Sequence, residues 1–211
     1  MTAEHQRQNA NAEGISKDAS IHDGGGESMF ESFKTRAEAV SAEVHRVATK
    51  ADALDFIVEV MKKEGISEAP GKYAVWADCP VLKGVDKAAL TAQIPGLKFE
   101  FDRIIAKGAH IGITQMDWGI ANTGTLAGDQ TAVEQRLASS LSWIHIALVA
   151  TDRILADLPS LMTKMHPNKT GFLALITGPS RTADIERVLT IGVHGPERLI
   201  IVCVDDLGGL N

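Results

Sequence analysis

The segment TGPSRTADIE at 177–186 combines a glycine turn, hydroxyl groups and an arginine. It follows an apolar, strand-like run and leads into a helix predicted over 182–190, beginning at Ser180 or Thr182. Free backbone N–H groups at the start of a helix, together with an arginine, favour a phosphate or carboxylate ligand. The candidate ligand-binding residues of this segment are Gly178, Ser180, Arg181 and Thr182.

The same segment is also typical of an ordinary helix start. Ser180 or Thr182 would then be the N-cap, and Asp184 and Glu186 would complement the helix dipole in the first turn. Both carboxylates would repel an anion unless Arg181 pairs with Asp184. A ligand site and a well-capped helix both remain open, and Asp184 is a candidate general acid or base.

A second turn, IGVHGPER at 191–198, brings the chain back into its last apolar run. His194 is the side chain of this turn that titrates near neutral pH, so it is a candidate acid, base or anion ligand. Arg198 stands at the mouth of the following strand and is a further candidate ligand. The glycines and the proline would also suit a purely structural turn.

The stretch IANTGTL at 120–126 places small polar residues between apolar ones. Their side chains can donate or accept hydrogen bonds, and a glycine lets a ligand or another chain segment approach closely. An Asx-type turn explains the pattern equally well. The candidate ligand-binding residues here are Asn122, Thr123, Gly124 and Thr125.

Composition argues against several classes of function. The formal net charge is -6 with no basic run, which disfavours a nucleic-acid partner. Cys79 and Cys203 belong to no Cys-x-x-Cys pair, so we expect neither a metal nor another cofactor in this chain, and a reducing, cytoplasmic location. No apolar run approaches the roughly 20 residues of a membrane span, and 1–13 lacks the apolar core of a signal peptide. The dinucleotide, P-loop, nucleophile-elbow and zincin motifs are missing too.

Hydrophobic periodicity predicts the elements that would position these residues. We expect a flexible tail over 1–26 and a single α/β domain over 27–211, with a mostly parallel sheet covered by helices on both faces. Thr49 is the predicted N-cap of the helix that runs to Gly65, and Pro159 should kink or restart the helix predicted over 152–166. Helices are predicted from 27 to 40, from Thr49 to Gly65, and over 131–140, 152–166 and 182–190. Strands are predicted over 44–48, 73–76, 97–101, 110–114, 143–150, 172–176 and 199–204.

Taken together, the stretches 120–126, 177–186 and 192–198 closely resemble the LUD-domain family, over roughly 30–206. The resemblance implies a fold similar to the sugar-phosphate isomerase and coenzyme A transferase superfamily. It also implies a role in oxidising L-lactate to pyruvate beside separate redox subunits that carry the iron-sulfur clusters. This chain would then be a non-redox component that contributes assembly, substrate handling or electrostatics.

The sequence departs from the family pattern at Asn122, where many members place an acid. The related transferases use a glutamate nucleophile, and an amide is neither a useful nucleophile nor a base, which disfavours covalent acyl transfer through this position. Glu186 is a poor substitute because it lies within the predicted helix.

Three functions follow, and whether the chain is an enzyme stays open. The first is a component of a lactate-oxidation system that binds a small anionic metabolite at Ser180, Arg181, Thr182 and His194, with Asn122 and Thr123 opposite. The second is a free-standing enzyme acting on a phosphorylated or coenzyme A-linked metabolite, with Asp184 or His194 as acid or base. The third is a structural or regulatory subunit.

Overall fold

The computed structural model describes residues 25–166, 168–182, 190–191 and 195–207. Nearly all of the predicted tail therefore lies outside the described residues. The first helix, α1 (Gly25–Ala39), starts close to the predicted Glu27.

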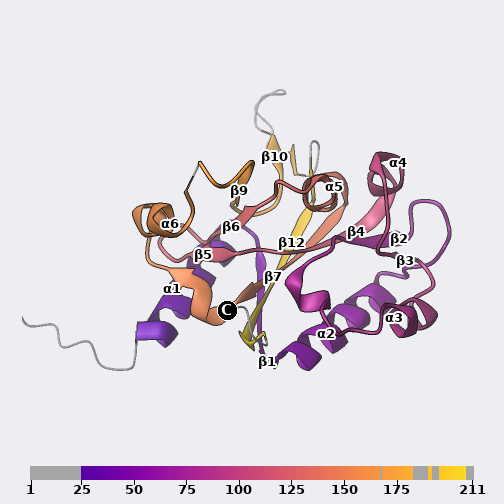
Figure 1. The fold of residues 1–211 in the computed structure, drawn as a ribbon, viewed down its shortest axis with the longest axis horizontal. Coiled ribbons are helices and arrows are strands. Elements are labelled where there is room, and N and C mark those ends of the chain that lie inside the picture. Colours follow the sequence, from indigo (N-terminus) through magenta and orange to yellow (C-terminus); the bar gives the residue numbers. More distant parts are fainter. Residues whose placement is uncertain (1–24, 167, 183–189, 192–194, 208–211) are drawn as a thin grey trace, which may run out of the picture.

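A six-stranded parallel sheet forms the centre of the structure, in the order β1-β12-β7-β4-β2-β3 (Figure 1). Its last strand in sequence is inserted between the first strand and β7, and both β7 and β12 are almost wholly buried, as their continuous apolar runs predict. The predicted parallel sheet is confirmed. Its strands are β1 (Glu43–Thr49), β2 (Tyr73–Trp76), β3 (Leu97–Lys98), β4 (Ala109–Gln115), β7 (Ile144–Ala150) and β12 (Arg198–Asp206).

Helices cover both faces of this sheet. On one face α2 (Lys50–Lys63) packs Ile57 and Met61 against Trp76 and Ile146. On the other face lie α1, whose Phe33 joins the second main core cluster, and α5 (Val133–Leu141), which packs on β4 (Figure 1). The predicted cap of α2 is confirmed, because the Thr49 side chain accepts from the backbone N–H of Asp52 in a capping box. Between β2 and β4 the chain also forms three short helical segments, η1 (Pro80–Leu82), α3 (Lys87–Gln93) and α4 (Arg103–Lys107).

A second, four-stranded sheet in the order β8-β5-β6-β9 lies beside α1. The predicted strand 172–176 belongs to this sheet and not to the central one, because β9 pairs antiparallel with β6. The polar stretch 120–126 is the turn of the hairpin between β5 and β6. Its strands are β5 (Trp118–Ile120), β6 (Thr125–Asp129), β8 (Ile154–Leu155) and β9 (Leu173–Ile176).

Two of the predicted helices are wrong in part. The segment 152–166 forms the turn η2 (Thr151–Arg153), strand β8 and only then α6 (Leu158–Lys164). Asp157 caps α6 by accepting from the backbone N–H of Ser160, and Pro159 occupies the first turn, where its missing N–H costs nothing. Pro159 therefore lies at the start of α6, which follows a strand, and the predicted kink or restart within one long helix is wrong.

The helix predicted over 182–190 is contradicted at both of its ends. Strand β10 (Arg181–Thr182) pairs antiparallel with β11 (Thr190–Ile191), and 183–189 lie outside the described residues. The β-branched residues Thr182, Thr190 and Ile191 favour this extended backbone. Ser180, Arg181 and Thr182 are therefore not helical, and the anion site expected from a helix start in this segment stays a prediction.

Candidate functional site

A pocket of about 460 Å³ lies between β9, α5 and the start of β7. One wall is the whole of β9, and the wall facing it comes from α5. The turn 177–180 and the residues Gly195 and Pro196 complete the lining. Volumes of this size are typical of small-molecule sites, so this pocket is the candidate functional site.

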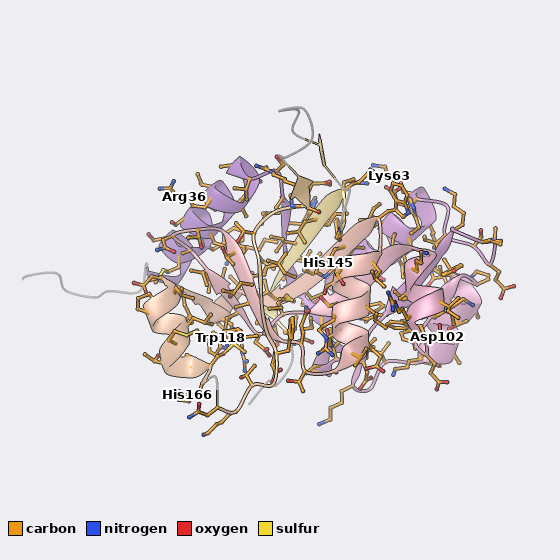
Figure 2. All side chains as sticks on the ribbon, turned by 90° about the horizontal axis from the view of Figure 1, so that it is seen from above. Arg36, Lys63, Asp102, Trp118, His145 and His166 are labelled. Carbon is orange, nitrogen blue, oxygen red and sulfur yellow. The ribbon has the colours of Figure 1, made fainter. Side chains whose placement is uncertain are left out.

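His145 forms part of the buried lining of the pocket. It is the second residue of β7 and lies in the middle of the molecule, with no exposed surface (Figure 2). Its Nε2 atom lies 2.8 Å from the Thr114 hydroxyl, whereas Nδ1 has no hydrogen-bond partner among the described residues. Burial lowers the pKa of His145 to about 4, which keeps the imidazole neutral at neutral pH.

The remaining lining combines hydroxyl groups with apolar side chains. At the buried end, the Ser139 hydroxyl donates to Oε1 of Gln130 over 3.0 Å, and Leu199 supplies an apolar wall. At the open end, Phe172 and Leu175 are each 48% exposed. None of the described lining residues carries a formal charge at neutral pH. The pocket therefore suits a molecule that offers it a neutral, hydrogen-bonding end.

The wall contributed by α5 depends on Gly112 of β4. A Cβ atom at this position would overlap the carbonyl oxygen of Ala138 and lie 2.7 Å from its carbonyl carbon. Only glycine lets the backbone of α5 approach the sheet this closely. That approach places Ser139 and Ser140 at the pocket.

Gly178 and Ser180, two of the predicted ligand-binding residues, do line this pocket together with Thr177. Gly178 has a φ of 72°, and the backbone N–H of Ser180 donates to the carbonyl of Pro196 over 2.8 Å. The turn is thus held against the segment that enters β12. Whether these residues bind a ligand stays a prediction.

Three predicted ligand-binding residues converge on the C-terminal turn of α1. The guanidinium of Arg181 donates to the Val40 carbonyl over 2.6 Å and to the Ser41 hydroxyl over 3.0 Å, where a cation complements the helix dipole. Gly178 packs its Cα against the same carbonyl, and Gly124, with a φ of 64°, packs against Ala37. These contacts give Gly124, Gly178 and Arg181 a structural role at the end of α1.

The hairpin turn between β5 and β6 is joined to the 177–180 turn. The Thr125 hydroxyl is buried and lies 2.8 Å from the hydroxyls of both Thr123 and Thr177. Asn122 is exposed, and its backbone N–H donates to the carbonyl of Ala156. The two stretches that the sequence singles out are therefore neighbours, as predicted, but Asn122 does not line the pocket described here.

Arg198 is the first residue of β12 and is not among the residues that line the pocket. Its guanidinium makes two hydrogen bonds to the Glu43 carboxylate, at 2.8 and 3.0 Å, and a third to Glu64 at 2.7 Å. Glu64 also lies 3.4 Å from Nε2 of His110. The hydrogen bonds from Arg198 lower the pKa of Glu43. Because this arginine is paired with two carboxylates, it has little capacity left for an anion.

Some of the predicted chemistry cannot be placed. The candidate acids or bases Asp184 and His194 lie outside the described residues. Within the described part of the chain, no group of three or more His, Cys, Asp or Glu side chains could hold a metal ion. Cys79 and Cys203 are both free and buried, and burial raises the pKa of their thiols to about 11 and about 12. No helix of the described residues is long and apolar enough to span a membrane.

His145 is the site residue that sequence reasoning missed. It lies inside the predicted strand 143–150, among apolar residues that gave no reason to single it out. The sequence offered one indication of its role, a titratable side chain within an apolar strand that is predicted to be buried on both faces.

A six-stranded parallel sheet, helices on both faces and a smaller second sheet define an α/β protein. The sequence matches the LUD domain over residues 30–204, so the chain belongs to the LUD domain family. It is 34% identical over 113 residues to Lactate utilization protein C 1 of Bacillus mycoides, covering 51% of this chain and 48% of that protein. It is 35% identical over 108 residues to Lactate utilization protein C of Macrococcus caseolyticus, covering 48% of this chain and 47% of that protein. The chain thus matches about half the length of these curated relatives.

Among solved structures, the crystal structure of a DUF162 family protein from Deinococcus radiodurans is similar, with a TM-score of 0.58 and 17% identity. The match covers 85% of this chain and 98% of that one. This similarity confirms the α/β fold.

The buried imidazole makes stability depend on pH. The unfolded chain takes up a proton at His145 below about pH 6.5, whereas the folded chain does so only near pH 4. Stability from this group is therefore fully present above about pH 6.5 and is lost as the pH falls toward 4. We expect urea unfolding to show that, relative to His145→Gln, the wild type loses about 3 kcal/mol over this range. Equal pH profiles would contradict a buried, neutral His145.

Proposed function

We propose that this chain is a component of a lactate utilization system and binds a small carboxylate metabolite in the pocket beside His145. The observation that carries the proposal is the pocket itself, in a LUD domain whose relatives include proteins named lactate utilization protein C. The oxidation step, in this proposal, belongs to separate iron-sulfur and redox subunits, and this chain handles the metabolite.

The lining of the pocket determines how a bound carboxylate would be oriented. Burying an ionised group without a partner costs several kcal/mol, and the described lining offers no cation to pair with it. The carboxylate would therefore stay near the open end, beside Phe172 and Leu175, where water reaches it. The neutral part of the ligand would point inward, toward Ser139 and His145.

The same uncharged lining favours a carboxylate over the phosphorylated ligand of the alternative function. A phosphate ester carries more charge than a carboxylate and requires more compensation from side chains or backbone N–H groups. The described lining supplies no charged side chain for this compensation, and the backbone N–H of Ser180 already donates to the Pro196 carbonyl. A small carboxylate is therefore the better fit.

Growth on lactate tests the proposed function. Deletion of the gene should abolish or strongly slow growth on L-lactate as sole carbon source and leave growth on glucose unchanged, and the wild-type gene should restore it. Ala174→Leu, which fills the pocket from β9, should restore growth poorly, whereas the matched control Ala174→Ser should restore it fully. Normal growth of the deletion strain on lactate would overturn the proposal.

A further inference from the structure

Strand β9 lies at one end of the strand order β8-β5-β6-β9, so it is an edge strand of the second sheet. It pairs with β6 on one side, and no strand of the described residues pairs with its other side. The pocket is lined by every residue of β9 and by no residue of β6. It therefore lies along the side of β9 that faces away from β6, which we call the free edge of β9.

The register of β9 against β6 determines which backbone groups point to the free edge. In an antiparallel pair, opposite residues alternate between pairs that exchange hydrogen bonds and pairs that do not. Gln130 donates its backbone N–H to the carbonyl of Phe172 over 2.8 Å, so every second residue from Phe172 onward is bonded to the β6 side. Leu173 and Leu175 lie between these positions, so their N–H and C=O groups point to the free edge.

The residues of β6 opposite these two leucines support this register. The carbonyl of Ala127, opposite Leu175, accepts from the backbone N–H of Asp117, which directly precedes β5. The backbone N–H of Asp129, opposite Leu173, donates to the Asp117 carboxylate over 2.7 Å. Both residues of β6 thus direct these groups away from β9, and they leave the N–H and C=O groups of the two leucines unpaired within the sheet.

Leu173 reaches the pocket through its backbone. Its side chain packs in the cluster of Leu161, on the α6 side of the second sheet. Ile176 packs instead in the cluster of Leu199, which is the apolar wall of the pocket. Successive side chains of a strand point to opposite faces, so Leu175 also directs its side chain away from Leu199. Both leucines therefore present mainly backbone atoms to the pocket.

We propose that the free edge of β9 binds the ligand of the pocket as it would bind a residue of a further strand, and that this ligand is a carboxylate with a hydrogen-bond donor on the adjacent carbon. The inference rests on the proposed function, in that a small carboxylate occupies this pocket. Leu175 stands at the open end and is 48% exposed. Its N–H donates to the carboxylate, and its carbonyl accepts from a hydroxyl or ammonium group of the ligand.

Such a ligand has the connectivity of a strand residue. In a strand residue the N–H and the C=O flank one carbon, and in a 2-hydroxy or 2-amino acid the donor group and the carboxylate do the same. The edge groups of Leu175 can therefore be paired by one small molecule. The described lining carries no formal charge, so a charge-assisted hydrogen bond from a backbone N–H is the interaction that stabilises the carboxylate.

Amide hydrogen exchange of the full chain, followed residue by residue by NMR, tests the contact directly. In the free protein, the amides of Leu173 and Leu175 should exchange much faster than those of Ala174 and Ile176, which donate to β6. Saturating L-lactate or L-alanine should slow exchange at Leu175 by about tenfold or more relative to Ala174. The alternate residues of the same strand are thus the control for any general stabilisation by the ligand.

Calorimetry with L-lactate, L-alanine and propionate tests the class of ligand. These three-carbon acids share the carboxylate, and the second carbon carries a hydroxyl, an ammonium group or no donor. At least one of the first two acids should bind about three- to tenfold more tightly than propionate, the effect of one hydrogen bond to the carbonyl of Leu175. The tighter of the two identifies the donor that the edge accepts.

A proline at position 175 removes the N–H that points to the pocket but no hydrogen bond to β6, which an edge strand tolerates. Leu175→Pro should bind the preferred acid about tenfold more weakly than Leu175→Ala, which keeps the amide. Ala174→Pro removes an N–H that donates to β6 and should instead lower the melting temperature. If Leu175→Pro does not fold, amide exchange of the wild type decides the question.

The outcomes distinguish this inference from the proposed function. Binding of an acid without slower exchange at Leu175, or binding of propionate as tightly as both other acids, would overturn the contact with the free edge and leave the carboxylate site in place. Equal affinities of folded Leu175→Pro and Leu175→Ala would overturn the contact as well. Binding of none of the three acids at millimolar concentration would overturn the carboxylate site itself.

Discussion

Replacing Gly112 with alanine is expected to lower the free energy of unfolding by about 3 kcal/mol or more. The new methyl group would overlap the Ala138 carbonyl oxygen, and its other near neighbours, the Ala138 carbonyl carbon and the Ser142 hydroxyl, both lie 2.7 Å away. Two of these three atoms belong to helix backbone, so a side-chain rotation cannot relieve the clash. The helix must move off β4, and Ser139 and Ser140 of the pocket would move with it. Urea unfolding at neutral pH measures the loss.

Gly128→Ala is the matched control for this substitution. Gly128 is also a buried strand glycine, but a Cβ atom there would first meet Cε of Met116 at 3.0 Å, the flexible end of a side chain. The control should cost about 1 kcal/mol or less, because methionine can adjust its rotamer. If the two variants unfolded at the same urea concentration, the close approach of α5 to β4 would be refuted.

The second large effect is expected for Gly124→Ala, which carries two penalties. The φ of 64° costs a residue with a side chain about 1–2 kcal/mol. The Cβ atom would in addition overlap the backbone nitrogen of Ala37 and lie 2.6 Å from its Cα, so α1 would have to leave the second sheet. We expect a total loss of about 3 kcal/mol or more, measured by thermal or urea unfolding.

Gly65→Ala separates the two penalties at position 124. Gly65 has a similar φ of 68°, but a Cβ atom there would meet nothing within 4 Å. Its substitution should therefore show the backbone strain alone. If Gly124→Ala lost no more free energy of unfolding than Gly65→Ala, the contact of Gly124 with α1 would contribute nothing. That result would contradict the structural role of Gly124.

The middle of the central sheet could be predicted from the sequence because β4, β7 and most of β12 are buried on both faces, whereas the edge strand β1 is partly exposed. The runs that form β7 and β12 are almost continuously apolar, and the capping box of Thr49 marks the start of α2, which follows β1. The second sheet could not be predicted in this way. Strands β5 and β8 have only three and two residues, too few for any periodicity to show, and β9 alone does not reveal its partner.

The candidate site was harder to predict, because the same residue types serve a turn and a ligand equally well. Gly178 and Ser180 do line the pocket, whereas Arg181 and Gly124 hold the end of α1 and Arg198 pairs with Glu43 and Glu64. The partners of all three residues lie more than 80 residues away in the sequence, and local patterns do not encode such contacts.

His145 illustrates the opposite error. A single histidine in an apolar strand looks structural, and only the tertiary fold shows that one nitrogen is tied to Thr114 while the other has no partner. The likeness to the coenzyme A transferase superfamily, and the roles of Asp184 and His194, stay predictions.

The location of a bound small carboxylate tests the proposed function most directly. In a crystal structure of the protein soaked with L-lactate, the ligand should occupy the pocket between β9 and α5, with its carboxylate toward Phe172 and Leu175. L-lactate bound instead at Arg198, with the pocket empty, would contradict the account.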